Sequence, residues 1–223
     1  MLKYIPVPIS DHDSVLGVGF NAKFAKEMKD YYSPFVKKKR EIILGKETWE
    51  YAVTDSIPGA VHMGSGNSMV DVATPTANVD VKGLSIGSLD KGLTTEASFL
   101  QNLQKGSDNV NTLFESQDFS KLKDMFVDGW LKKAVVAGNV YLFIVVREKK
   151  TKKVYYCLFK TEHSSLTDAE FISKMSLRGG RGVHVPLMDD EFGSTYICIS
   201  KRRLELRLNC VGLKDYLVES HTV

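Results

Sequence analysis

Two aspartates and a lysine have the spacing to share one face of a β-hairpin. The hairpin is predicted around a turn at Pro75-Thr76, with alternating valines in both strands. Because side chains alternate between the faces of a strand, the valines lie on one face of the hairpin, and Asp71, Asp80 and Lys82 lie on the other. A turn of two or four residues places Asp71 directly across from Asp80, whereas a turn of odd length would break this register.

The chemistry of such a face is that of a divalent metal site. Directly opposed β-carbons lie roughly 4.5–5.5 Å apart, so the two carboxylates repel each other unless a cation lies between them. Mg²⁺ prefers oxygen ligands, and the backbone carbonyl of Val81 offers another one. Phosphodiester hydrolysis needs a cation to polarise the phosphate, a way to make hydroxide and positive charge for the pentavalent state. Asp71, Asp80 and Lys82 therefore predict metal-dependent phosphodiester cleavage.

The short pattern is common, and its context separates the three copies in this chain. An acidic residue two positions before a lysine also occurs at Glu27-Met28-Lys29 and Glu148-Lys149-Lys150. The first of these lies in a helical pattern and the second in a charged turn. Only Asp80 lies in a predicted strand with an upstream Asp on the partner strand. The alternative is that these side chains form the solvated face of an ordinary hairpin. The opposed carboxylates count against it.

This arrangement resembles the signature of a known nuclease family. Val70-Asp71, a short spacer and Asp80-Val81-Lys82-Gly83 are similar to the PD-(D/E)xK motif, whose best-known members are type II restriction endonucleases. The resemblance covers roughly residues 65–160, and Val70 replaces the usual Pro. It implies that Asp71 and Asp80 hold Mg²⁺ and that Lys82 assists the attacking water. A helical carboxylate sometimes joins the family's site, and four candidates precede the hairpin: Glu27, Glu41, Glu47 and Glu50.

The periodicity of the flanking segments predicts an α/β (α+β) fold, with a central mixed β-sheet flanked by helices as in restriction endonucleases. Ser33-Pro34 resembles an N-cap followed by the first residue of a helix. The nearly continuous apolar run from Val140 is typical of a strand covered on both faces. Further helices are predicted at 94–104 and 119–133, and further strands at 140–147, 154–160, 196–199 and 204–208.

A single nuclease domain is expected over residues 1–223. Its parts would be a helical N-terminal part (1–60), a catalytic core (65–160) and a DNA-recognition and C-terminal part (162–223). The three cysteines are too few and too scattered for a disulfide framework or a zinc site. The start of the chain has no apolar signal core, and no apolar run is long enough to span a bilayer, so a cytoplasmic protein is expected.

Basic residues are clustered, although the net charge is only +3. Arg178 and Arg181 lie in a glycine-rich loop, where close approach to a DNA backbone or base edge is sterically easy. The alternatives are that the basic run from Lys37 to Arg40 forms a solvated helix face, and that Arg178 and Arg181 lie in a mobile surface loop. The candidate DNA contacts are Lys37, Lys38, Lys39, Arg40, Asn78, Arg178, Arg181, Arg202 and Arg203.

The resemblance implies a Mg²⁺-dependent, sequence-specific type II restriction endonuclease that acts on double-stranded DNA. Cleavage of both strands of a symmetric site is most simply achieved by a homodimer. A cognate methyltransferase would then belong to the same system. Two alternatives remain open: a structure-specific repair, recombination or phage nuclease, and a non-catalytic DNA-binding module of the same fold.

Overall fold

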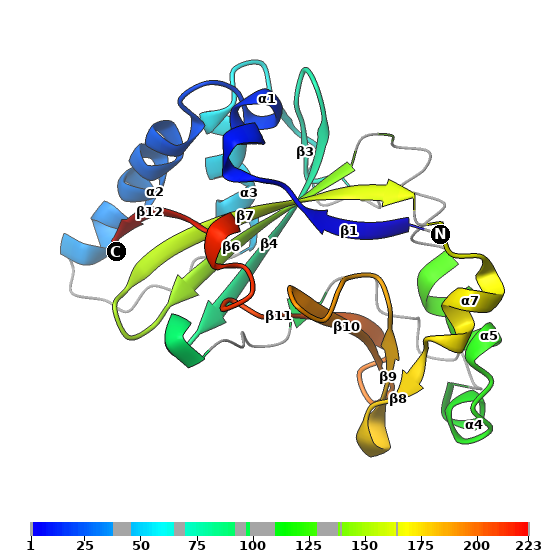
Figure 1. The fold of residues 1–223 in the computed structure, drawn as a ribbon. Coiled ribbons are helices and arrows are strands. Elements are labelled where there is room, and N and C mark those ends of the chain that lie inside the picture. Colours follow the sequence, from blue (N-terminus) through cyan, green and yellow to red (C-terminus); the bar gives the residue numbers. More distant parts are fainter. Residues whose placement is uncertain are drawn as a thin grey trace.

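A seven-stranded mixed sheet lies at the centre of the molecule (Figure 1). The structure, a computed structural model, describes residues 2–37, 46–64, 70–91, 97–98, 110–128, 138, 140–163 and 165–222. The strand order is β1-β7-β6-β4-β3-β2, and β12 also pairs with β7. Only the pairing of β4 with β6 is parallel among these described strands. The strands are β1 (Leu2–Pro6), β2 (Val61–His62), β3 (Val72–Ala73), β4 (Asn78–Ile86), β6 (Val140–Glu148), β7 (Lys153–His163) and β12 (Val218–Thr222).

A second, five-stranded antiparallel sheet packs on one side of the main sheet (Figure 1). Its order is β5-β11-β10-β9-β8. The sequence predicts the strands at 196–199 and 204–208 but not the sheet that they join. The strands are β5 (Ala97–Ser98), β8 (Ser176–Leu177), β9 (Gly182–Val185), β10 (Gly193–Cys198) and β11 (Arg203–Leu208).

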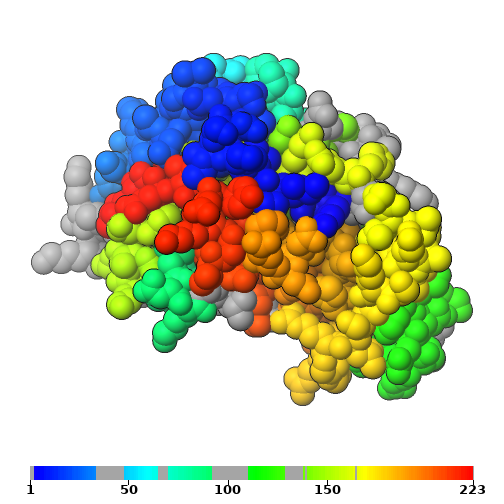
Figure 2. Space-filling model, in the orientation of Figure 1, coloured from blue at the N-terminus to red at the C-terminus, as the bar shows by residue number. Residues whose placement is uncertain are grey.

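Helices cover the opposite face of the main sheet, which confirms the predicted class of a mixed sheet flanked by helices (Figure 1). These are α1 (His12–Leu16), α2 (Phe20–Lys37) and α3 (Lys46–Ser56). Shorter helices lie beside the second sheet, and in Figure 2 they form one lobe with it. They are α4 (Val110–Glu115), α5 (Phe119–Lys123), a π-helical segment at Asp124–Asp128 and α7 (Asp168–Ser173). Single 3₁₀ turns occur at Ile9–Asp11, Leu89–Lys91, Gly179–Arg181 and Lys214–Tyr216.

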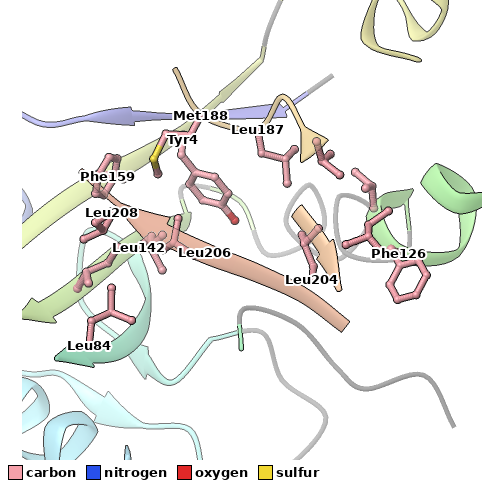
Figure 3. Packing of buried hydrophobic residues seen from close by; sticks show 14 of the residues in the cluster. Tyr4, Leu84, Phe126, Leu142, Phe159, Leu187, Met188, Leu204, Leu206 and Leu208 are labelled. Carbon is pink, nitrogen blue, oxygen red and sulfur yellow. The ribbon is translucent and has the colours of Figure 1, made fainter. Parts of the chain in front are cut away.

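Strand β6 is buried on both faces, as its apolar run predicts. Phe143 packs edge-on against Phe20 and Phe24 of α2, with ring centroids 5.6 and 5.5 Å apart. Leu142 points the other way, into the cluster between the two sheets. Figure 3 shows that cluster, with Leu84, Leu142 and Phe159 of the main sheet facing β11. The main sheet therefore has two buried faces with different covers.

The predicted helix start at Ser33-Pro34 is wrong, because α2 runs through both residues to Lys37. Pro34 has no N–H to donate to the carbonyl of Asp30, four residues earlier. The Ser33 hydroxyl donates to that carbonyl instead, at 3.3 Å. The local side-chain bond replaces the missing backbone bond, so the helix continues.

The two later helix predictions have mixed outcomes. The helix predicted at 94–104 is wrong at Ala97–Ser98, which form β5 against β11, and its other residues lie outside the described ones. The helix predicted at 119–133 is helical as far as Asp128, with Leu122 and Phe126 buried, and its remainder is likewise outside the description.

The cysteines are free and buried, as their number and spacing indicate. Cys157 and Cys210 lie in the apolar cluster between the sheets. In the part of the chain that the structure describes, no helix combines the length and apolar character needed to cross a membrane.

Gly83 of β4 tests how closely α3 packs on the main sheet. A Cβ at this position would lie 2.9 Å from Nε1 of Trp49, a buried α3 residue. We expect Gly83→Ala to displace the indole and to lower the free energy of unfolding by about 1–3 kcal/mol in urea titrations. At Gly87 a Cβ would meet nothing within 4 Å, so Gly87→Ala should change stability by no more than about 0.5 kcal/mol. Equal effects of the two variants would contradict the packing.

Candidate active site

The turn between β3 and β4 has the even length that the predicted register requires. Val72 pairs with Val79 and Ala73 with Asn78, so the loop proper is Pro75-Thr76. Its closing bond runs from Thr74 N to Ala77 O at 2.8 Å, and the Thr74 hydroxyl accepts a bond from Ala77 N at 2.9 Å. A threonine that satisfies the turn's own backbone groups explains why the loop closes here.

This register brings Asp71, Asp80 and Lys82 together on one face. Lys82 Nζ donates a short hydrogen bond to Asp80 Oδ1 and lies 3.6 Å from Asp71 Oδ2. Asp71 Oδ2 also accepts a hydrogen bond from the backbone N–H of Val81, at 2.8 Å. The backbone of β4 therefore orients the first carboxylate, and the lysine bridges both.

The three side chains are largely withdrawn from solvent. Their exposed fractions are 9% for Asp71, 4% for Asp80 and 12% for Lys82. Burial, followed by the neighbouring charge of Asp71, raises the pKa of Asp80 to about 7, although the positive charge of Lys82 opposes this shift. A divalent cation bound between the two carboxylates would favour the ionised form of Asp80 and reduce the repulsion between them.

The donor set fits a hard divalent cation such as Mg²⁺. It consists of oxygen atoms: the carboxylates of Asp71 and Asp80 and the carbonyl of Val81, which lies 3.3 Å from Lys82 Nζ. Asp80 Oδ2 is buried and has no hydrogen-bond partner among the described residues. A buried oxygen of this kind is satisfied when it binds a cation. Among the described residues, no group of three or more His, Cys, Asp or Glu side chains has the geometry of a metal site.

The helical carboxylates proposed to join the site have separate environments. Glu50 of α3 is buried and pairs with Nε2 of His62 at 3.0 Å. His62 pairs with Val72 and so shares the helix-covered face, opposite to Asp71. Oε1 of Glu27 lies 3.5 Å from Nζ of Lys26. Glu41 and the side chain of Glu47 are outside the described residues.

Two of the predicted DNA-contacting arginines meet on the second sheet. The Arg178 guanidinium lies over the ring of Tyr196, 4.1 Å from its centroid. The Tyr196 hydroxyl donates to Glu205 Oε2 at 2.7 Å, and Arg203 Nε donates to Glu205 Oε1 at 2.5 Å. Lys201 Nζ also lies 3.0 Å from Glu205 Oε1. We call these five residues the Glu205 cluster.

The Glu205 cluster is a fixed, net positive group of side chains. Burial raises the pKa of Glu205, but hydrogen bonds from Tyr196, Lys201 and Arg203 outweigh it and hold that pKa below its usual range. The carboxylate is therefore ionised and orients two cations, while Arg178 adds a third. Because Leu204 and Leu206 point into the core between the sheets, the cluster lies on the sheet face turned away from that core.

The remaining predicted DNA contacts do not converge on one surface. Asn78 donates to the carbonyl of Gly138 at 3.3 Å. Arg181 is exposed in its 3₁₀ turn, and Arg202 occupies a turn with φ of +50°. Lys37 ends α2, but its side chain is not among those described, and Lys38, Lys39 and Arg40 lie outside the described residues.

Sequence reasoning missed Tyr196, Lys201 and Glu205 as partners of the arginines. The alternation in the last predicted strand carried part of the signal, since Glu205 lies between Leu204 and Leu206. The pairing of Tyr196 with Glu205, however, depends on the register between β10 and β11, which the sequence does not specify. His62 was missed for a similar reason, because β2 is only two residues long.

Comparisons with known proteins assign no family to this chain. The sequence matches no protein-family model, and neither the curated proteins nor the solved structures give a match. The resemblance to the PD-(D/E)xK signature therefore depends on Asp71, Asp80 and Lys82 and on the arrangement of these residues.

The raised pKa of Asp80 gives a pH-dependent stability in metal-free buffer. The unfolded side chain ionises near pH 3.9, and the folded one at about 7. Between these values the unfolded state releases the proton first, so the free energy of unfolding should fall as pH rises from about 4 to 7. We expect Asp80→Asn to be more stable than wild type by about 1–3 kcal/mol at pH 8 in urea titrations with EDTA. At pH 4 the two proteins should agree within about 0.5 kcal/mol. Parallel pH profiles would contradict this assignment.

Proposed function

We propose that this chain is a Mg²⁺-dependent endonuclease that hydrolyses phosphodiester bonds of DNA. The observation that carries the proposal is the pair of buried carboxylates, Asp71 and Asp80, bridged by Lys82 on one face of the hairpin. This constellation supplies oxygen ligands, a positively charged donor and a low-dielectric surrounding in one place. An ordinary solvated hairpin face has no need to bury three charged groups.

Each residue has a distinct part in this reaction. Asp71 is oriented by the Val81 N–H, so one of its oxygens is held in a fixed direction. Asp80 and the Val81 carbonyl complete the set that would hold Mg²⁺, which when bound polarises the phosphate and lowers the pKa of a coordinated water. Lys82 Nζ stabilises the negative charge that develops on the phosphate oxygens and hydrogen-bonds the attacking water. Its bond to Asp80 keeps the ammonium in position.

The substrate class follows from the charges beyond the site. The Glu205 cluster presents Arg178, Lys201 and Arg203 around a single carboxylate, and such preorganised cations suit a DNA backbone. We further propose sequence-specific cleavage of double-stranded DNA in the manner of type II restriction endonucleases, by a homodimer, with a cognate methyltransferase in the same system. A structure-specific nuclease with the same chemistry is the second candidate, because two exposed apolar residues, Val61 and Met63, lie beside Asp71.

Cleavage assays on plasmid and linear DNA with Mg²⁺ test the chemistry. Wild type is expected to cleave, and EDTA to abolish cleavage. Asp80→Asn and Lys82→Ala should each lower the rate on the order of 100-fold or more, because each removes a group that acts on the reacting phosphate or on the metal. Asp80→Asn is useful here because it is expected to fold at least as well as wild type.

The matched control is Lys150→Ala, which removes the exposed lysine of Glu148-Lys149-Lys150, a triplet with the same spacing. It should cleave like wild type. Discrete bands from plasmid DNA would support the restriction-type proposal, and preference for branched DNA would support the second candidate. Undiminished cleavage by Asp80→Asn would refute the site, and lack of cleavage of any DNA by wild type would leave a non-catalytic module.

Arg178 tests the Glu205 cluster as a DNA contact. Loss of one phosphate contact should weaken duplex binding several-fold and reduce the slope of log K against log salt by about 1. We therefore expect Arg178→Ala to show both effects in fluorescence anisotropy titrations with Ca²⁺ in place of Mg²⁺. Lys26→Ala removes an equal charge from α2, where Asp30 and Glu27 already neutralise it, and should leave the slope unchanged. An unchanged slope for Arg178→Ala would exclude this residue from the interface.

A further inference from the structure

Strand β2 lies next to the candidate site at the edge of the main sheet. Val61 pairs with Ala73 of β3, and the N–H of Met63 donates to the carbonyl of Asp71 at 2.9 Å. Directly opposed residues in antiparallel pairs have β-carbons roughly 4.5–5.5 Å apart. Met63 is therefore the immediate neighbour of the first catalytic carboxylate.

The side chains of Val61 and Met63 point to the same side of the sheet as the site. Val61 shares its side with Ala73 and Asn78, and the alternation along β4 places Asp80 there as well. Both side chains are unusually exposed for apolar residues in a sheet, at 59% for Val61 and 47% for Met63. We call this pair the apolar edge.

On the other face of β2, the ring of His62 lies beside that of Tyr51 of α3, with ring centroids 4.5 Å apart. Glu50 Oε2 lies 3.0 Å from Nε2 of His62. Tyr51 is 44% exposed. The same edge of the sheet thus presents apolar surface on one side and aromatic surface on the other, beside carboxylates whose bound cation would hold a phosphate.

A nucleotide whose phosphate binds a cation held by Asp71 and Asp80 would lie on the same side of the sheet as the apolar edge, because both carboxylates point to that side. In duplex DNA the flat faces of the bases are stacked on each other, and only their edges are accessible in the grooves. Exposed apolar and aromatic side chains contact base faces where bases are unpaired. The chemistry of the apolar edge therefore fits an unpaired base better than a base pair.

Given the proposed nuclease function, we infer that Val61 and Met63 bind the base next to the cleaved phosphate, and that the preferred substrate carries an unpaired base at this position. Such substrates are single strands, flaps, bubbles and frayed ends. This favours the structure-specific reading of the nuclease over cleavage of fully paired sites. The two side chains act as specificity-determining residues and take no part in the hydrolysis.

The size of the apolar edge argues against a second copy of the chain as its occupant. A stable protein interface involves about 20–30 residues on each side. The apolar edge comprises two exposed side chains, and its neighbours on the same face are the charged residues of the site. A two-residue strand also offers few backbone groups for pairing with another sheet.

The test compares one labelled DNA strand in three states: single-stranded, fully paired, and paired with a three-nucleotide bubble. Wild type with Mg²⁺ should cleave the single strand and the bubble at least about 10-fold more efficiently than the duplex, as kcat/KM. The double variant Val61→Ser, Met63→Ser should lose about 10-fold on unpaired substrates and less than about threefold on the duplex. Binding of the single strand in Ca²⁺, measured by anisotropy, should weaken in parallel.

The control is Val18→Ser, Val211→Ser, which replaces two valines that are 81% and 59% exposed elsewhere on the surface. It should cleave all three substrates like wild type. Equal cleavage of paired and unpaired DNA by wild type would overturn the inference while leaving the nuclease proposal standing, as would wild-type behaviour of the Val61, Met63 variant. A variant that changes from dimer to monomer in sedimentation without a change in preference would show a self-association edge. Absence of any cleavage would refute both proposals.

Discussion

The burial of two like charges side by side is the constraint on which this structure depends. Asp71, just before β3, and Asp80 of β4 lie close together with little access to solvent, and the Lys82 ammonium lies near both. Two neighbouring carboxylates repel each other strongly in low-dielectric surroundings, so the arrangement persists only if the rest of the fold holds it. The Val81 N–H and the tight Pro75-Thr76 turn do so locally. Stability is given up at the site in return for a preorganised affinity for a cation.

The parallel pairing of β4 with β6 holds the hairpin from behind. It extends over the whole of β4, from Asn78 to Ile86, so one end of β4 carries the charged face while the other is anchored by Leu84 and Ile86 in the core between the sheets. On the opposite face Val79 and Val81 pack under the helices. The same strand thus has one face on which Val79 and Val81 are buried under the helices, and a second face that changes along the chain from charged at Asp80 and Lys82 to apolar at Leu84 and Ile86. The carboxylates therefore lie on a rigidly held part of the main sheet, outside its apolar contacts with the second sheet.

The features that the sequence predicts are those set by local periodicity. Alternation in β4, the even turn and the apolar run of β6 lead directly to the juxtaposition of Asp71, Asp80 and Lys82, although their catalytic roles stay a prediction. Long-range contacts determine what was missed. The second sheet depends on pairing between short strands such as β5 and β8, which have too few residues for a period. Helix α2 passes through Pro34 because a serine hydroxyl replaces a backbone bond, which propensity alone does not reveal.

Whether Asp71 and Asp80 hold a divalent cation is tested most directly by anomalous X-ray scattering from crystals grown with Mn²⁺. We expect a strong anomalous peak between the two carboxylates, which is lost in crystals of Asp80→Asn grown under the same conditions. Persistence of the Lys82 bridge with no peak at this place, or a peak bound only by other residues, would contradict it.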